Sequence, residues 1–370
     1  MRVGVPKEIK DHEDRVGLVP SSVAELVRHG HEVLIQAGAG LGAGLEDGLY
    51  VAAGGRIVPD AETIFRDAEM VVKVKEPLAP ERKKLRPGQV LFTYLHLAPD
   101  REQTGDLLKS GVTGIAYETV TSPIGTLPLL TPMSEIAGRL APQVGARYLE
   151  RTSGGRGVLL GGVPGVPPGE VVVLGGGVSG THAATIALGM GATVTVVDRS
   201  AEVLRRIAVQ LPAARTIFST HDALVQVVRR ADLLIGAVLV PGAAAPKLVT
   251  RDMVKTMKTG SVLVDIAIDQ GGCSETSRPT SHSDPVYLEE GVIHFCVTNM
   301  PGAVARTSTF ALNNATLPFV LALADKGWRR AIVEDPHLRN GLNVHAGKLT
   351  CKPVAEAQGL TYTAPEQLAA

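Results

Sequence analysis

Four polar residues in this sequence have side chains suited to proton transfer beside a carboxylate. Arg15 lies in a polar loop after the first apolar run, and a guanidinium group can hold a carboxylate through two parallel hydrogen bonds. Lys75 and His96 end the apolar runs VVKVK and FTYLH, and an imidazole exchanges protons near neutral pH. Asp269 follows the run SVLVDIAI and can accept hydrogen bonds from an amine or from water. Together they could bind a substrate carboxylate, move a proton and orient a water molecule.

Each of these residues also has an ordinary structural interpretation. A single arginine in a loop is usually a solvated surface charge, and Lys75 could cap one face of a sheet edge while Lys73 caps the other. His96 could be a polar residue at a strand end, and Asp269 could belong to a turn, where aspartate is common. We interpret Asp265, in the preceding strand, as a structural hydrogen-bonding residue. Which interpretation holds for each residue therefore depends on the strands and loops that position its side chain.

A glycine motif follows an apolar run in the second half of the chain. The segment VVVLGGGVSGTHAA places Gly175, Gly177 and Gly180 in the spacing GxGxxG between a predicted buried strand and a predicted helix. The first glycine permits a tight turn, the second lets a pyrophosphate approach the backbone, and the third allows close packing of helix and strand. The helix N-terminus presents free N–H groups to an anion. The motif therefore predicts a dinucleotide site.

An acidic residue lies where such a site would bind a ribose. Asp198 ends the next predicted strand, about 20 residues after the glycines, which is the position that hydrogen-bonds the adenosine ribose. Its carboxylate would repel a 2′-phosphate, which favours NAD over NADP. Arg199 follows directly and could offset part of this repulsion.

A second glycine-rich segment, QAGAGLGAG at residues 36–44, also follows a predicted strand. Its spacing fails because Ala43 and Leu45 occupy the third glycine position of the two possible registers. We interpret this segment as a flexible or close-packed loop that binds no cofactor.

The elements that carry these residues alternate between strands and helices. RVGVP, SSVAELVRHG and HEVLIQ predict strand, helix, strand, and a second alternating series begins at EVVVLGGG. Such alternation is typical of parallel sheets, so we predict two α/β domains that face each other across a cleft. Between the two series, residues 121–135 and 154–169 are rich in proline and glycine. The long apolar segment FALNNATLPFVLALADKG predicts a helix interrupted near Pro318.

Composition excludes several classes of partner. The chain has 370 residues, 37 Lys plus Arg and 37 Asp plus Glu, with no basic stripe for nucleic acid. No signal peptide or membrane-length apolar run is visible. The cysteines Cys273, Cys296 and Cys351 are too scattered for a disulfide framework, and no cluster has the spacing of metal ligands. We expect a cytoplasmic protein with reduced cysteines and no bound metal.

Taken together, several long segments resemble the L-alanine dehydrogenases, within the alanine dehydrogenase/transhydrogenase NAD-binding family. The resemblance extends from the first residues to about residue 350, and its most specific segments are KEP at Lys75, LFTYLHLA, TPMSEIAGRLA, GGRGVLLGGVPGV, GAVLVPGAAAPKLV, VDIAIDQGGCSETS and VTNMPGAVARTSTFAL. It implies an α/β protein of two Rossmann-like domains with an NAD-binding domain, residues 128–306, inserted into a discontinuous substrate domain, residues 1–127 and 307–370. It also implies NAD-dependent, reversible oxidative deamination of L-alanine to pyruvate and ammonia, and usually a homohexamer.

The resemblance also implies a role for each candidate residue. Arg15 and Lys75 match positions that bind the substrate carboxylate and carbonyl, His96 matches the catalytic acid/base, and Asp269 matches the second catalytic residue, which orients water or the amine. Beyond the three glycines, the matched cofactor positions are Ser134, Val178, Asp198, Ser219, Val238, Leu239, Ile266, Ala267, Ile268, Asp269, Arg278, Val297, Thr298, Asn299 and Met300. The sequence departs from the family pattern at Ser179 and His182 in the glycine turn, and at Ala305, where proline is common. None of these departures touches the expected chemistry.

Two alternatives remain open at this stage. The soluble NAD-binding module of a proton-translocating transhydrogenase has the same fold but needs no amino-acid site. A non-catalytic protein that senses NAD would bind NADH without using any amino acid to reduce NAD.

Overall fold

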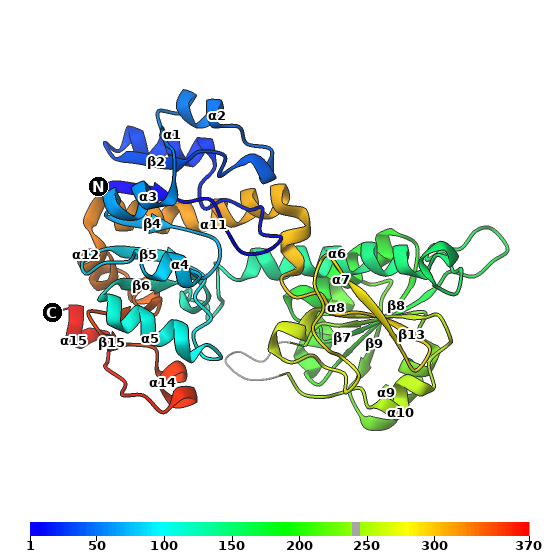
Figure 1. The fold of residues 1–370 in the computed structure, drawn as a ribbon. Helices are drawn as coiled ribbons and strands as arrows, with labels where there is room; N and C mark the ends of the chain where they lie inside the picture. The colour runs from blue at the N-terminus through cyan, green and yellow to red at the C-terminus, as the bar shows by residue number, and fades with distance from the viewer. Residues whose placement is uncertain (239–244, 370) are drawn as a thin grey trace. The chain divides into compact units, whose positions relative to one another are not determined.

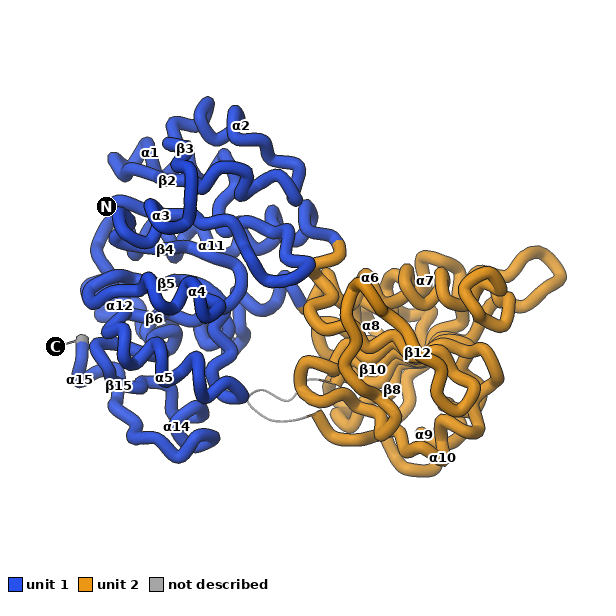
Figure 2. The backbone as a smooth tube through the Cα atoms, viewed as in Figure 1, with its two compact units in different colours: residues 1–133, 304–370 blue, residues 134–303 orange. Residues whose placement is uncertain are grey.

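The computed structural model describes residues 1–238 and 245–369 of the chain. The chain divides into two compact units (Figure 2): unit 1 comprises Met1–Met133 and Val304–Ala370, and unit 2 comprises Ser134–Ala303. The boundaries expected from the sequence, after residues 127 and 306, lie a few residues from these. Among the described residues, no helix combines the length and the hydropathy needed to cross a bilayer.

Unit 1 is built on an eight-stranded sheet in the order β15-β14-β6-β5-β4-β1-β2-β3. Neighbouring strands from β3 to β6 pair in parallel, whereas β14 is antiparallel to β6 and β15 is antiparallel to β14. The strands are β1 (Arg2–Val5), β2 (Glu32–Gln36), β3 (Arg56–Val58), β4 (Met70–Val72), β5 (Val90–Thr93), β6 (Thr113–Ala116), β14 (Leu342–His345) and β15 (Lys348–Leu349).

The helices of unit 1 pack on this sheet (Figure 1), and their N-termini follow from local sequence. Asp60 caps α3 by accepting a 2.8 Å hydrogen bond from Thr63 N, and Asp100 caps α5 in the same way from Gln103 N. The helices are α1 (Pro20–Arg28), α2 (Asp47–Ala52), α3 (Ala61–Asp67), α4 (Ala79–Arg82), α5 (Arg101–Ser110), α11 (Ala305–Lys326), α12 (Trp328–Glu334), α13 (Pro336–Arg339), α14 (Lys352–Gln358) and α15 (Glu366–Ala369), with short 3₁₀ turns η1 (Leu41–Ala43) and η2 (Tyr117–Thr119).

Helix α11 corrects one expectation from the sequence. It continues from Ala305 to Lys326 with Pro318 inside it, so the predicted interruption is wrong. Proline removes one intrahelical hydrogen bond, but Leu312, Val320 and Leu323 are buried on both sides of it. Tertiary packing therefore outweighs the local cost of the proline.

Unit 2 is built on a seven-stranded sheet in the order β12-β13-β11-β10-β7-β8-β9, parallel except for β12. The strands are β7 (Glu170–Leu174), β8 (Thr193–Asp198), β9 (Arg215–Phe218), β10 (Leu233–Gly236), β11 (Val262–Asp265), β12 (Val286–Glu289) and β13 (Val292–Phe295). The helices are α6 (Thr131–Leu149), α7 (Val178–Gly189), α8 (Ala201–Gln210), α9 (His221–Arg230) and α10 (Arg251–Lys255), with 3₁₀ turns η3 (Arg151–Ser153), η4 (Ile266–Gln270) and η5 (Met300–Val304).

The two units share one strand order. The parallel strands run β3-β2-β1-β4-β5-β6 in unit 1 and β9-β8-β7-β10-β11-β13 in unit 2, which is the doubly wound order of Rossmann folds. The predicted class, two Rossmann-like α/β domains, is confirmed. In such sheets the order reverses beside the first strand, and ligands bind at the carboxyl ends of the strands at that point. Ligand sites are therefore expected at the loops after β1 and β4 in unit 1 and after β7 and β10 in unit 2.

Candidate active site

The glycine turn of unit 2 lies between β7 and α7 and has the geometry of a phosphate-binding turn. Gly175 has φ of +96°, a conformation that side chains disfavour. A Cβ on Gly180 would lie 1.7 Å from the carbonyl oxygen of Gly175, so only glycine fits there. Gly177 is the N-cap of α7, and a Cβ on it would meet nothing within 4 Å. The first and third glycines are thus required by the fold, whereas the second keeps the face of the turn open.

Asp198, at the end of β8, lies beside this turn. Its Oδ2 accepts a 2.7 Å hydrogen bond from Gly176 N, and its Oδ1 accepts one of 2.8 Å from Ser200 N. The carboxylate is thereby fixed at the carboxyl edge of the sheet, next to the helix N-terminus. An open backbone cradle with an anchored carboxylate fits the pyrophosphate and ribose of a dinucleotide, and it disfavours a 2′-phosphate.

The other candidate cofactor residues of unit 2 follow the carboxyl ends of its parallel strands. Ser219 follows β9 and donates its N–H to Asp198 O at 2.9 Å, Val238 follows β10, and Val297 follows β13. Because these strands are parallel, their carboxyl ends meet at one edge of the sheet. Further candidates lie in the same strand-end loops: Ile266, Ala267, Ile268 and Asp269 on η4, then Thr298, Asn299 and Met300. Leu239 lies outside the described residues.

Asp269 and Asp265 have different surroundings although they are close in sequence. Asp269 is exposed on η4 rather than directly following a strand, because β11 ends at Asp265. Asp265 is fully buried and accepts hydrogen bonds from Ala267 N, Cys273 N and Ser277 Oγ at 2.6–3.1 Å. Asp265 is therefore the structural residue that the sequence indicated, and Cys273 is buried beside it.

Two further cofactor candidates are positioned by helix α6 and by an aromatic ring. Ser134 is half-buried in the first turn of α6. The Arg278 guanidinium lies 3.8 Å from the centre of the Tyr287 ring, and its main-chain N–H donates a 2.8 Å hydrogen bond to the Tyr287 hydroxyl. This stacking holds the segment between η4 and β12 in one place.

In unit 1, Arg15 is a buried residue and not a solvated surface charge. Its Nε donates a 2.7 Å hydrogen bond to Glu13 Oε1, its Nη2 pairs with the other oxygen, and both side chains are almost completely buried. Its Nη1 lies 3.0 Å from the sulfur of Met133. A buried guanidinium held by a bidentate carboxylate is oriented in advance for a second anion.

Lys75 lies in the loop after β4, because that strand ends at Val72 and not at Lys75. Glu8, in the loop after β1, accepts hydrogen bonds from Val74 N at 2.7 Å and from Lys75 N at 3.4 Å. These two loops flank the point where the strand order of unit 1 reverses. The half-buried Lys75 is therefore held where the fold predicts a ligand site.

Beneath this loop lies a buried ion triad, so Lys73 does not cap a sheet edge. Lys73 Nζ lies 2.9 Å from Glu8 Oε2 and 2.7 Å from Glu81 Oε1, and all three side chains are buried. Burial raises the pKa of Glu8, and the adjacent ammonium of Lys73 opposes this shift. The triad ties together the loop after β1, the loop after β4 and helix α4.

His96 lies in the loop after β5 with an unusual backbone, since its φ is +50°. Its N–H donates a 2.6 Å hydrogen bond to Glu118 Oε1, and Leu95 N lies 3.2 Å from both oxygens of the same carboxylate. The imidazole stacks on the Tyr94 ring, with centroids 5.6 Å apart and an interplanar angle of 25°. Its side chain is 43% exposed, so the ring is held but reachable from solvent.

The charged side chain that faces the His96 ring is that of Glu76. Its Oε2 lies 3.6 Å from His96 Nδ1, and its Oε1 pairs with Lys10 Nζ. Burial would raise the pKa of Glu76, but the facing His96 ring and the positive charges of Lys75 and Lys10 outweigh it and hold the pKa well below its usual value. Glu76 is therefore an anion beside the candidate acid/base.

The sequence interpretation missed three carboxylates of this site: Glu13, Glu76 and Glu118. Glu13 and Glu76 are sequence neighbours of Arg15 and Lys75, so a search for acids flanking each candidate cation would have found them. Glu118 is 22 residues from His96 and gave no local signal. In the part of the chain that the structure describes, no group of three His, Cys, Asp or Glu side chains could hold a metal ion.

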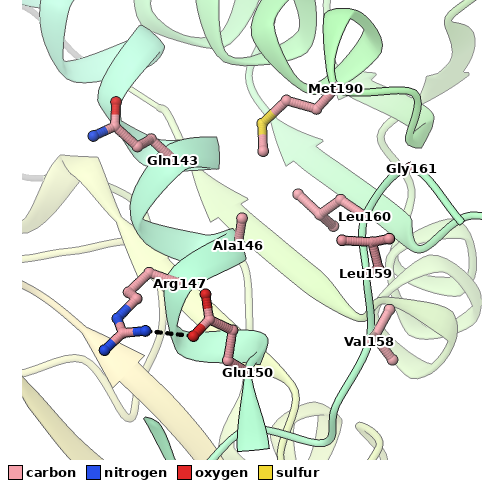
Figure 3. A pocket seen from close by; sticks show the side chains of 9 residues that line it. All are labelled: Gln143, Ala146, Arg147, Glu150, Val158, Leu159, Leu160, Gly161 and Met190. Carbon is pink, nitrogen blue, oxygen red and sulfur yellow. Dashed lines mark hydrogen bonds and ion pairs between the residues drawn. The ribbon is translucent and has the colours of Figure 1, made fainter. Parts of the chain in front are cut away.

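The surface also carries a cavity of about 380 Å³ in unit 2, away from the candidate residues. Figure 3 shows helix α6 on one side and the segment 158–161 with Met190 on the other. The lining residues are Gln143, Ala146, Arg147, Glu150, Val158, Leu159, Leu160, Gly161 and Met190. None of the predicted site residues contributes to it, so this cavity does not bear on the chemistry.

Comparison with protein-family models shows which family this chain belongs to. The model of the alanine dehydrogenase/PNT N-terminal domain matches residues 4–137, and that of the alanine dehydrogenase/PNT C-terminal domain matches residues 141–352. The chain belongs to the alanine dehydrogenase/PNT family.

Individual members of the family match along almost the whole chain. The alanine dehydrogenase of Halomonas elongata is 60% identical, with 98% of each chain covered, and that of Mycolicibacterium smegmatis is 56% identical, with 100% of each chain covered. A solved L-alanine dehydrogenase superposes with a TM-score of 0.94 at 54% identity, covering 97% of this chain and 99% of that one. A transhydrogenase from Sinorhizobium meliloti superposes with a TM-score of 0.81 at 26% identity, covering 94% and 98%.

Proposed function

We propose that this protein is an NAD-dependent L-alanine dehydrogenase that converts L-alanine reversibly to pyruvate and ammonia. The observation that carries the proposal is the full-length identity of 54–60% to alanine dehydrogenases from several organisms. The site geometry supports it, because a buried guanidinium, an anchored lysine loop and a held imidazole occur in one unit. This is the set of groups that an amino-acid substrate requires.

The residues of unit 2 fit NAD. The glycine turn and Asp198 would hold the pyrophosphate and the adenosine ribose, and the loops after β9, β10, β11 and β13 would hold the rest. When bound, NAD accepts the hydride that leaves the α-carbon of the substrate. We accordingly assign cofactor binding to unit 2 and substrate binding to unit 1, in keeping with the domains expected from the sequence.

The chain's own side chains supply the remaining steps. In this proposal Arg15 and Lys75 bind the substrate carboxylate and carbonyl, with Arg15 oriented by Glu13. His96 takes up and returns the protons that accompany attack of water and departure of ammonia. Asp269 orients the water or the amine.

The proposal extends to the state of the protein in the cell. Family members of this kind lead us to expect a homohexamer, and the scattered free cysteines favour the reducing cytoplasm. Small molecules, namely L-alanine, pyruvate and ammonia, are the expected partners.

The transhydrogenase module is the second candidate function. Its support is the structural likeness at 26% identity, against 54% for the L-alanine dehydrogenase. The two functions differ in one measurable property, because only the dehydrogenase uses an amino acid to reduce NAD. The same measurement separates it from an NAD-sensing protein.

The test is NADH formation with a panel of amino acids, together with NADH consumption by pyruvate plus ammonium. We expect L-alanine to be preferred over glycine and 2-aminobutyrate by about 10- to 200-fold, since each differs from it by one methylene, worth about 1–3 kcal/mol in an apolar pocket. The His96→Ala variant should lose turnover and still bind NADH. Binding of NADH without turnover of any amino acid by the native chain would refute the proposal.

A further inference from the structure

The His96 ring is flanked by two carboxylates that hold different parts of the residue. Glu118 accepts hydrogen bonds from the main chain of His96 and Leu95, so it fixes the backbone. The carboxylate of Glu76 instead faces the ring nitrogen Nδ1 at 3.6 Å. The two carboxylates therefore act on different degrees of freedom of the same imidazole.

One of the two carboxylate oxygens of Glu76 lacks a hydrogen-bond partner in the part of the chain that the structure describes. Its Oε2 is buried and has no hydrogen-bond partner among the described residues, although Oε1 is paired with Lys10. Leaving a buried acceptor without a hydrogen bond destabilises the folded protein, so such an atom needs an explanation. The atom that faces it is His96 Nδ1, at a distance beyond a hydrogen bond but within reach of a small ring rotation. Catalytic hydrogen bonds are often long in a free enzyme and shorten when substrate binds.

We propose that Glu76 is a positioning residue that accepts the Nδ1 proton of His96 and so leaves Nε2 as the atom that exchanges protons during turnover. The inference rests on the proposed function, in which His96 is the acid/base. A neutral imidazole carries one proton on either of two nitrogens, and a carboxylate facing one nitrogen selects the tautomer. When Nε2 takes a proton, the ring becomes a cation and the facing carboxylate stabilises it; when Nε2 releases the proton, the neutral ring returns with Nδ1 still protonated.

The groups around Glu76 keep it charged and in place. Lys10 pairs with its other oxygen, and Lys75 adds a second positive charge from the adjacent position of the chain. Tyr94 stacks on the imidazole and limits its rotation. Glu118 contacts the main chain of His96. Among the described contacts of His96, it is the one negatively charged side chain besides Glu76.

Steady-state kinetics of Glu76→Gln give the first test, with Glu62→Gln as the matched control. Glu62 also pairs with a lysine of unit 1, Lys84, but on the exposed surface. We expect kcat of Glu76→Gln to fall about 10- to 100-fold with little change in the KM of NAD, as part of the 10²–10⁴-fold that acid–base catalysis supplies. The control should keep its kcat.

A double-mutant cycle separates positioning from a general structural role. If Glu76 acts through His96, the change Glu76→Gln should cause no further loss of the residual rate in the His96→Ala background. An equal loss in both backgrounds would overturn the proposal, because Glu76 would then act independently of the ring.

A measurement of the ring itself does not depend on turnover. In protein labelled with ¹⁵N-histidine, the ring of His96, assigned by its loss in His96→Asn, should show the Nδ1–H tautomer when it is neutral. Glu76→Gln should shift it toward Nε2–H, the form that free histidine favours. Predominance of Nε2–H in the native protein would overturn the proposal whether or not alanine is the substrate. Absence of amino-acid turnover in the native protein, with the Nδ1–H form present, would instead refute the proposed function and leave the Glu76–His96 pairing standing.

Discussion

The Glu118 carboxylate accepts a 2.6 Å hydrogen bond from the main-chain N–H of His96, whose φ is +50°. A non-glycine residue pays about 1–2 kcal/mol for this left-handed conformation, so it persists only where the surroundings fix it. Both oxygens of Glu118 also lie 3.2 Å from Leu95 N. A single carboxylate thus holds two successive amides and sets the direction in which the imidazole points.

Replacing Glu118 by glutamine should release this backbone. The amide NH₂ is a donor facing two donors, so the variant loses one acceptor and gains a repulsion. We expect a fall in kcat of at least about tenfold and a loss of unfolding free energy of about 1–3 kcal/mol. Urea unfolding and steady-state kinetics measure the two effects. Glu102→Gln, which alters an exposed partner of Arg82, is the control, and an unchanged kcat in Glu118→Gln would contradict the role assigned to this contact.

Alanine substitutions at two glycines of the turn should affect different properties, stability in one case and NADH binding in the other. Gly180→Ala places a Cβ 1.7 Å from Gly175 O, so we expect a loss of unfolding free energy of about 1–3 kcal/mol, the usual cost of overpacking. Gly177→Ala meets nothing within 4 Å, so its thermal stability should stay close to that of the native protein while NADH affinity falls at least about tenfold. Calorimetry and fluorescence titration with NADH distinguish the two variants. Full NADH affinity in Gly177→Ala would show that no pyrophosphate approaches this residue.

Lys10→Met should lower stability in a pH-dependent manner. Glu76 has a folded pKa held below its ordinary value, so its contribution to stability is present above about pH 4.3 and is lost as the pH falls through the folded value. Removing Lys10 removes one cause of the shift. The variant should therefore be less stable than the native protein near neutral pH, and the difference should shrink in acid. Urea unfolding across this range measures it, and a difference that grows in acid would contradict the sign.

Lys73→Met should be the most destabilising of these substitutions. It leaves Glu8 and Glu81 buried without their shared cation, and breaking a buried ion pair costs about 3–5 kcal/mol. Lys84→Met removes a surface partner of Glu62 and should cost less than about 1 kcal/mol. Chemical denaturation compares the two directly. Equal losses would mean that the triad is no more important than a surface pair.

Arg15→Lys should act on substrate binding. Lysine cannot reproduce the two-point contact with Glu13, and its ammonium is a single mobile charge. We expect the KM of pyruvate to rise at least about tenfold while the dissociation constant of NADH stays unchanged. A matched loss of NADH affinity would place Arg15 outside the substrate site.

The parts of the site that the sequence predicted are those encoded by local spacing. Gly175, Gly177 and Gly180 form one turn, and Asp198 follows at the fixed distance that one helix and one strand impose, so a single sequence carries the signal. The strand order could be inferred only as parallel βαβ units, and the structure confirms that class. In these cases backbone geometry ties residue type to position.

The parts that could not be predicted depend on long-range packing. Glu118 reaches His96 from the turn η2, and nothing in either segment indicates the contact. The apolar runs before Lys75 and His96 predicted strands that extend to these residues, but β4 and β5 end three residues earlier, where the backbone turns toward the ligand edge. Likewise, α11 passes through Pro318 because buried contacts on both sides outweigh the local preference. The glycine-rich segment after β2 is close-packed, since Gly40 and Gly42 leave no room for a Cβ.

The division of unit 1 into two chain segments has a consequence for biosynthesis. Strand β6 pairs with β5 on one side, but its other partner, β14, is synthesised only after the whole of unit 2, as is β15. Until then the nascent first segment exposes an unpaired strand edge, whereas unit 2 is already complete. Unit 2 should therefore reach its folded state first, and the open edge of β6 is the place where a chaperone would have to protect the growing chain from mispairing.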